Sequence, residues 1–148
     1  MSGKVLGLAR RAKSRAPMET MDAASVTVAA GIEGDSRGKP DARQVTVLTR
    51  EAWEAACAEL GQAPDWTTRR ANILIEGLRV EGKPGRIIRI GEVELEITGE
   101  TDPCNRMDEQ VPGLRQALTP DWRGGVTCRV RHDGNIAVGD AVSLSGQE

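Results

Sequence analysis

The segment Arg86–Thr98 (RIIRIGEVELEIT) alternates apolar with charged side chains over most of its length. Successive side chains of a strand point to opposite faces, so this alternation is typical of a strand buried on one side and exposed on the other. Gly91 interrupts the pattern near its middle and suits a tight turn. The segment therefore predicts a hairpin of two strands, over Arg86–Ile90 and Glu92–Thr98.

Short alternating or apolar segments recur along the chain, separated by glycine-containing turns. Further strands are predicted over Lys4–Ala9, Val26–Ala30, Arg43–Leu48, Asn72–Ile75, Gly125–Arg131, Ile136–Val138 and Val142–Leu144. About eight or nine short strands favour closure into a barrel, because closure pairs the edges. Two helices are also predicted, one capped by Thr49 and ended by Gly61, the other over Pro112–Leu118. The fold class is therefore mostly β, a barrel with two or three short helices.

Composition narrows the range of functions. The 148 residues suffice for a single domain, 1–148, whose core needs no disulfide or metal. The formal net charge of −2 and the absence of Phe and Tyr argue against nucleic acid or a membrane surface as partner. No apolar stretch approaches the ~20 residues that span a bilayer, and the N-terminal segment lacks a secretory-signal pattern. Three cysteines fit free thiols in a reducing compartment, so we expect a cytoplasmic protein.

The three cysteines fall in different sequence environments. Cys57 and Cys128 lie on apolar faces of a predicted helix and strand, and are predicted to pack as small hydrophobic side chains. Cys104 instead follows a proline, in a predicted loop with the polar residues Thr98, Glu100, Asp102, Asn105 and Arg106. Such a position suits a reactive thiol, whose thiolate a nearby cation would stabilise. The alternative is an exposed loop cysteine without a role.

Polar loops of the chain contain several arginines: Arg37, Arg43, Arg70, Arg106 and Arg123 lie in or beside them. Guanidinium groups bind phosphate through paired hydrogen bonds. The glycine-rich loop Gly31–Ala42 follows neither the Walker A nor the Rossmann spacing, although main-chain N–H groups in such turns bind anions. The alternative is that these arginines are ordinary surface charges.

Two other kinds of site are disfavoured by the same sequence. His132 is the only histidine and is expected at an exposed turn, which argues against a Cys–His nucleophilic pair with Cys104. No CxxC or HxxxH spacing occurs, so an ordinary four-ligand zinc site is not predicted.

Several stretches, in order along nearly the whole chain, resemble the MOSC domain, a family named for the C-terminal domain of molybdenum cofactor sulfurase. They are Gly31-Ile-Glu-Gly-Asp with Arg37, Arg43-Gln-Val-Thr, Arg70-Ala-Asn-Ile-Leu, Gly85-Arg through Ile90-Gly91, Thr98-Gly-Glu-Thr-Asp-Pro-Cys104-Asn-Arg-Met, Pro112-Gly-Leu, Arg123-Gly-Gly-Val and Ile136-Ala-Val-Gly-Asp140. The stretch that contains Cys104 is the most specific of them.

The resemblance implies a β-rich barrel and assigns the central role to Cys104, as carrier of a persulfide or as ligand of molybdenum in a pterin cofactor. Residues predicted to bind that cofactor, the molybdenum cofactor (molybdopterin), are Arg43, Arg70, Asn72, Thr98, Glu100, Arg106, Arg123 and Gly124. Some larger relatives carry a pyridoxal-phosphate domain. No lysine here suggests a Schiff base, so desulfurase chemistry is not expected.

Three functions remain open at this stage. The first is a molybdenum-cofactor protein that reduces N-hydroxylated compounds; it would need an external electron donor, because the sequence shows no haem, flavin or iron–sulfur motif. The second is a metal-free sulfur carrier in which Cys104 passes persulfide sulfur to a partner protein. The third is a non-catalytic binding barrel. Partners of the first two are a pterin cofactor or a sulfur-donor or acceptor protein.

Overall fold

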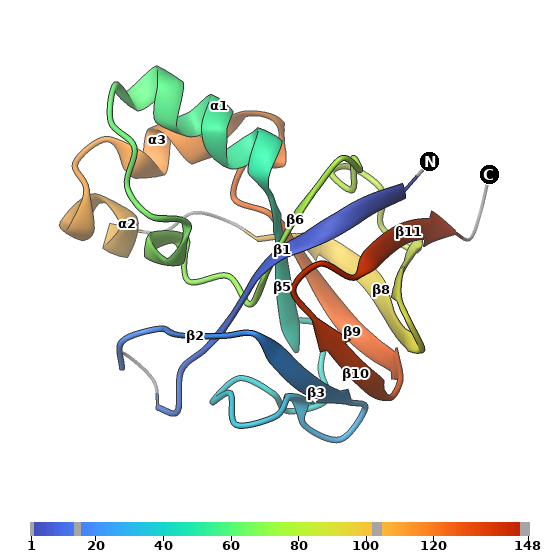
Figure 1. Ribbon diagram of the computed structural model, residues 1–148. Helices are drawn as coiled ribbons and strands as arrows, with labels where there is room; N and C mark the ends of the chain where they lie inside the picture. Colours follow the sequence, from blue (N-terminus) through green and yellow to red (C-terminus); the bar gives the residue numbers. More distant parts are fainter. Residues whose placement is uncertain (1, 14–15, 102–104, 146–148) are drawn as a thin grey trace.

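The computed structural model describes residues 2–13, 16–101 and 105–145. Within these residues seven strands form a closed barrel (Figure 1), in the order β11 (Ala141–Ser145), β7 (Ile87–Ile90), β8 (Val93–Glu100), β9 (Val126–His132), β5 (Val45–Thr49), β6 (Ile73–Glu76) and β1 (Ser2–Arg10). The barrel closes because β11 also pairs with β1. The predicted mostly-β, barrel-like fold is therefore confirmed.

Neighbouring barrel strands run antiparallel except β5 and β6, which are parallel. A parallel pair requires a crossover connection. Here the crossover contains α1 (Arg50–Leu60) and the 3-10 turn η1 (Trp66–Arg69). The connection from β8 to β9 contains α2 (Asn105–Gln110), α3 (Leu114–Leu118) and the 3-10 turn η2 (Pro120–Trp122).

The two ends of the barrel are covered differently. The α-helices gather at one end, with α1 against α3 and α3 against α2 (Figure 1). Toward the other end lie β2 (Glu19–Met21), which pairs with β1, and a second sheet of β10 (Gly134–Ala137), β3 (Ala23–Thr27) and β4 (Gly31–Ile32). No helix in the described part of the chain is long and apolar enough to cross a membrane.

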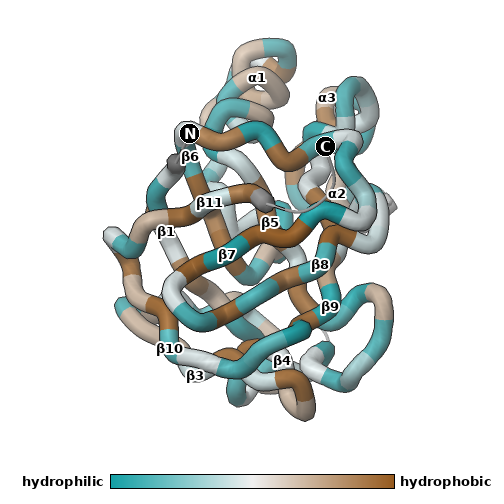
Figure 2. The backbone as a smooth tube through the Cα atoms, turned by 90° about the vertical axis from the view of Figure 1, so that its right-hand side faces the viewer, coloured by the Kyte–Doolittle hydropathy of each residue, from teal (hydrophilic) through white to brown (hydrophobic). Residues whose placement is uncertain are grey.

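The hydrophobic core consists of two clusters of buried side chains. One fills the barrel and contains Leu95 and Cys128, among other residues; the second lies beneath the helices and contains Trp53 and Met107. Figure 2 shows the alternation of hydrophobic and hydrophilic residues along β7 and β8, which lie side by side. Cys57 packs at the edge of the second cluster, so both cysteines predicted to pack do so.

Local sequence signals account for α1 and for the hairpin. Thr49 caps α1 through its hydroxyl oxygen, which accepts a hydrogen bond from the main-chain N–H of Ala52 (3.2 Å), and Gly61 ends the helix with φ of 76°. β7 and β8 pair with Ile88 opposite Leu95, and Gly91 lies in the turn between them. These predictions are confirmed.

Other element boundaries were predicted wrongly. β3 ends at Thr27, and residues 28–30 form a turn before β4. α3 begins at Leu114 rather than Pro112, because Gly113 adopts φ of 89°. The predicted loop around Cys104 is shorter than expected: Thr98 and Glu100 belong to β8, where they extend the pairing with β9, and Asn105 begins α2. Among the α2 side chains that the structure describes, Met107 is the buried one, and one apolar residue gives no periodic signal.

Candidate functional site

A cavity of about 180 Å³ opens where the end of β1, the loop after β4, η1 and the end of β8 meet. The segments that form it are far apart in sequence. Its lining consists of Arg11, Met18, Asp35, Arg37, Arg43, Thr46, Arg69, Arg70, Asn72, Thr101, Met107 and Thr127. Of the residues predicted to bind a cofactor, the structure brings Arg43, Arg70 and Asn72 together here.

The cavity is strongly cationic. Five arginines line it, and Asp35 is the only carboxylate among the lining residues that the structure describes. Charges of one sign in a concave site raise the local concentration of ligands of the opposite sign. The described lining therefore favours an anionic ligand.

Arg69 forms part of the cavity floor and is 6% exposed. Its Nε donates to the main-chain oxygen of Gly124 (2.8 Å), and its Nη2 donates to the main-chain oxygen of Thr101 (3.2 Å). A Cβ atom on Gly124 would lie 2.6 Å from that same Thr101 oxygen, so only glycine fits at this position. Gly124, predicted to bind the cofactor, thus supports the floor through its backbone.

Arg70 and Asn72 follow η1 and hold three segments together. Arg70 has a positive φ of 66° at the end of η1, and its Nη2 donates to the main-chain oxygen of Ala16. The side chain of Asn72 donates from Nδ2 to the oxygen of Ala9 (3.2 Å) and accepts at Oδ1 from the N–H of Thr46 (3.0 Å). Asn72 therefore ties β1 to β5 at the cavity.

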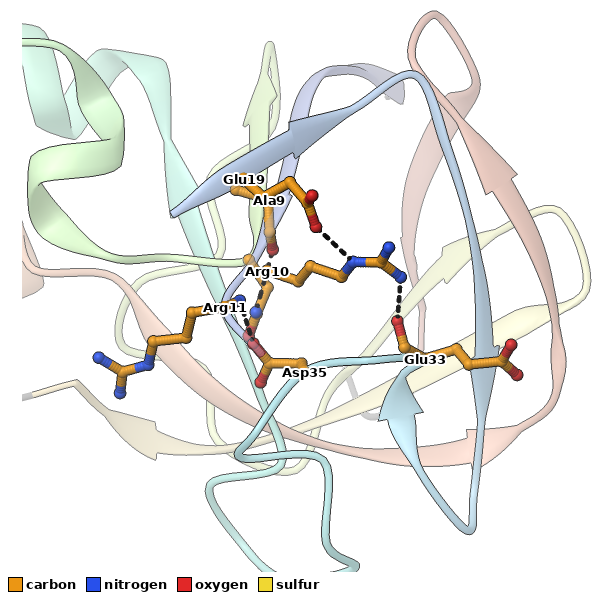
Figure 3. A network of polar contacts seen from close by, with 7 residues as sticks. Ala9, Arg10, Arg11, Glu19, Glu33 and Asp35 are labelled. Atoms are coloured by element: carbon orange, nitrogen blue, oxygen red, sulfur yellow. Dashed lines mark hydrogen bonds and ion pairs between the residues drawn. The ribbon is translucent and has the colours of Figure 1, made fainter. Parts of the chain in front are cut away.

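The end of β1 directs two successive arginines to opposite sides (Figure 3). Arg10 points away from Arg11 and contacts the Glu19 carboxylate (3.0 Å) and the main-chain oxygen of Glu33 (2.7 Å). Asp35 accepts at Oδ1 from the main-chain N–H of Arg11 (3.0 Å). Its second oxygen, Oδ2, accepts from the main-chain N–H of Arg37 (3.1 Å). The Asp35 carboxylate thus fixes the backbone of two cavity arginines at once.

Cys104 lies outside the described residues, as do Asp102 and Pro103. Thr101, the last residue described before this segment, lines the cavity, and so does Met107, three residues after Cys104. Thr101 is 7% exposed, and its hydroxyl oxygen is buried without a hydrogen-bond partner among the described residues. The side chain of Arg106 also falls outside what the structure describes.

Three other predicted residues lie elsewhere. The Thr98 hydroxyl bonds within the barrel wall, to the main-chain oxygens of Ala42 and Thr127 and to the Thr127 hydroxyl. Glu100 ends β8 but is not among the lining residues. Arg123 lines a second cavity of about 550 Å³ beside α1, and its Nη1 contacts the Glu59 carboxylate at 2.9 Å.

Among the described residues, neither Cys57, Cys128 nor His132 lines the cavity. Burial, with a smaller contribution from the Glu96 carboxylate, raises the pKa of the Cys128 thiol far above its ordinary value. Burial and then Glu54 likewise raise the pKa of Cys57. His132 is exposed, and five residues of strand place it about 17 Å from Thr127. The described residues contain no group of three or more His, Cys, Asp or Glu side chains that could hold a metal.

Sequence reasoning missed several lining residues, among them Arg11, Asp35, Arg69 and Thr101. Arg69 adjoins Arg70 in sequence, and the pair of adjacent arginines was a usable signal. Asp35 belongs to the predicted polar loop. The contact of Asp35 with Arg11 has no local signal, because 24 residues separate them.

Comparisons with known proteins agree on the fold. A family model described as the MOSC domain matches residues 34–143. The YuaD protein from Bacillus subtilis superposes with a TM-score of 0.84 at 22% identity, covering 99% of this chain and 98% of that one. YiiM from Escherichia coli (TM-score 0.68, 19% identity, 98% and 71% coverage) and YiiM from Geobacillus stearothermophilus (0.67, 17%, 97% and 73%) are also similar. The search of curated proteins found no match.

Proposed function

Because the chain belongs to the MOSC domain family, we propose that it binds the molybdenum cofactor at the arginine-lined cavity, with the Cys104 thiolate as ligand of the metal. The observation that carries this proposal is the cluster of five described arginines at one cavity. The lining of this cavity also includes Thr101 and Met107, which lie three residues before and three residues after Cys104 in the sequence. Three residues of chain reach at most about 11 Å, which keeps Cys104 within range of the cavity.

The residues present fit the anionic end of such a cofactor. Arginine suits phosphate because its planar guanidinium makes paired hydrogen bonds. The buried Thr101 hydroxyl, without a partner among the described residues, offers a further donor or acceptor. A volume of about 180 Å³ is below the ~300–1,000 Å³ of sites that enclose a drug-sized ligand. The cavity is therefore sized for the phosphate end.

The arginines and Cys104 would have different roles in binding the cofactor. Arg70 and Arg11 would bind the phosphate, and Arg69 keeps the floor in place through its bonds to Gly124 and Thr101. Cys104 would supply a soft thiolate to the metal. The bound cofactor would supply two-electron redox chemistry, such as reduction of an N–O bond, with electrons from an external donor. A free Cys104 thiol requires a reducing compartment, consistent with the expected cytoplasm.

The test is the molybdenum and pterin content of the wild type, Cys104→Ala and Cys57→Ala, each expressed in cells that make the cofactor and purified without oxygen. We expect near-stoichiometric metal in the wild type and in Cys57→Ala, whose cysteine lies on α1, and loss of metal in Cys104→Ala. Absence of metal from all three would overturn the proposal. One added sulfur on Cys104 in the intact mass would then identify a sulfur carrier instead.

A further inference from the structure

The loop between β4 and β5 contains the same local motif twice. In Asp35-Ser-Arg37 and in Asp41-Ala-Arg43, the aspartate carboxylate accepts a hydrogen bond from the main-chain N–H of the arginine two residues later, at 3.1 and 2.8 Å. We propose that Arg37 and Arg43 bind a second anionic group, a phosphate or carboxylate of the substrate, so that Arg43 contacts the substrate rather than the cofactor to which the resemblance assigned it. This inference rests on the proposed function, since it adds a substrate class to the same site.

In each motif the aspartate bonds the main chain of the arginine. An aspartate that bonds the backbone two residues on closes a turn, and its oxygen is then engaged by an N–H rather than by the guanidinium. Within the described residues, neither Arg37 nor Arg43 has a side-chain hydrogen bond or ion pair. Both side chains are exposed and both line the cavity, so they form its outer rim.

The loop that carries this pair is fixed at its base. Gln44, 1% exposed, donates from Nε2 to the main-chain oxygens of Gly38 (2.9 Å) and Val28 (2.8 Å), and accepts at Oε1 from the N–H of Val130. Gly38 packs so closely that a Cβ atom would lie 1.7 Å from the oxygen of Ala30. A fixed backbone lowers the entropy lost when the two arginines bind a ligand.

The arginines of the cavity differ in where they lie. The described lining contains five arginines and one carboxylate, Asp35. Arg69 and Arg70 donate to main-chain oxygens inside the cavity wall, whereas Arg37 and Arg43 lie at its rim. Arg37 and Arg43 therefore lie where a substrate would enter.

The experiment measures binding of two probes, inorganic phosphate and benzoate, to cofactor-loaded and cofactor-free protein. Proton–nitrogen spectra of the arginine Nε groups identify which guanidinium responds. One double variant, Arg37→Gln/Arg43→Gln, is called the rim variant. The control, Arg79→Gln/Arg129→Gln, removes the same charge from exposed positions outside the cavity.

We expect a probe to shift the Nε resonances of Arg37 and Arg43, and its affinity to fall at least tenfold in the rim variant but less than twofold in the control. A response to phosphate alone identifies the second anionic group of the substrate as a phosphate, and a response to benzoate alone identifies it as a carboxylate. Equal affinity in the wild type and the rim variant, or resonance shifts at other arginines only, would overturn the inference. Cofactor content is measured separately. Failure of the proposed function is therefore distinguishable from failure of this inference, because probe binding to Arg37 and Arg43 can still be measured in the cofactor-free protein.

Discussion

Arg69 and Gly124, which are 55 residues apart in sequence, meet at the floor of the cationic cavity, where the Arg69 Nε donates a hydrogen bond of 2.8 Å to the Gly124 main-chain oxygen. The same guanidinium reaches the oxygen of Thr101, the residue directly after β8. One buried side chain thus joins η1 to the segments that precede and follow the helical connection between β8 and β9.

Replacing Arg69 with alanine is expected to lower the free energy of unfolding by about 2–4 kcal/mol, because two buried carbonyl groups lose a charged donor. Denaturant unfolding followed by tryptophan fluorescence measures the effect. Arg129→Ala, at an exposed position on β9, serves as the control and should change stability by less than about 0.5 kcal/mol. Equal stability of the two variants would show that water replaces the Arg69 contacts.

Gly124→Ala tests the close approach beneath Arg69. The added Cβ would lie 2.6 Å from the Thr101 oxygen, which is backbone and cannot move as a flexible side chain would. We expect a loss of about 1–3 kcal/mol in unfolding free energy, as for other overpacked sites. Gly99→Ala is the matched control on β8, where the nearest atom to a Cβ lies 3.8 Å away. The prediction fails if both alanine variants unfold at the same denaturant concentration.

The barrel strands and α1 could be predicted because their signals are local. Alternation defines β8 with its buried Leu95, and a cap at each end defines α1. α2 could not be predicted, because its stability comes from docking Met107 into the second core cluster rather than from a repeated apolar pattern.

The candidate site residues also divide into those with a local sequence signal and those without one. Arg70 and Arg43 were found because arginines beside polar loops suggest anion binding, and the structure brings both to one cavity. The proximity of Arg11 to Asp35 depends on how β1 lies against the loop after β4. A sequence carries no local record of such a contact. The roles of Cys104 and of the predicted cofactor-binding residues stay predictions.

Cys128 is expected to make the free energy of unfolding depend on pH in the alkaline range. Folding buries this thiol and raises its pKa above the ordinary value of 9.0. A raised pKa in the folded state means that the stabilisation is complete below about pH 9 and is lost as the pH rises further. The unfolding free energy of the wild type should therefore fall, relative to Cys128→Val, by about 1.4 kcal/mol per pH unit above that point. Parallel curves for the two proteins from pH 8 to 11 would contradict the prediction.

Asp35 is expected to act as a positioning residue whose loss loosens two separate segments of backbone. Its two carboxylate oxygens accept from the N–H groups of Arg11 and Arg37, so Asp35→Ala removes both bonds while leaving the barrel core intact. Each bond to a charged acceptor contributes about 1.5 kcal/mol or more, so amide hydrogen exchange at both residues should accelerate roughly tenfold. Asp41→Ala is the matched control, because its carboxylate bonds only the N–H of Arg43 among these three arginines. If Arg11 exchanges equally fast in the two variants, Asp35 does not hold the end of β1 against the loop, and the arrangement of arginines at the cavity must have another cause.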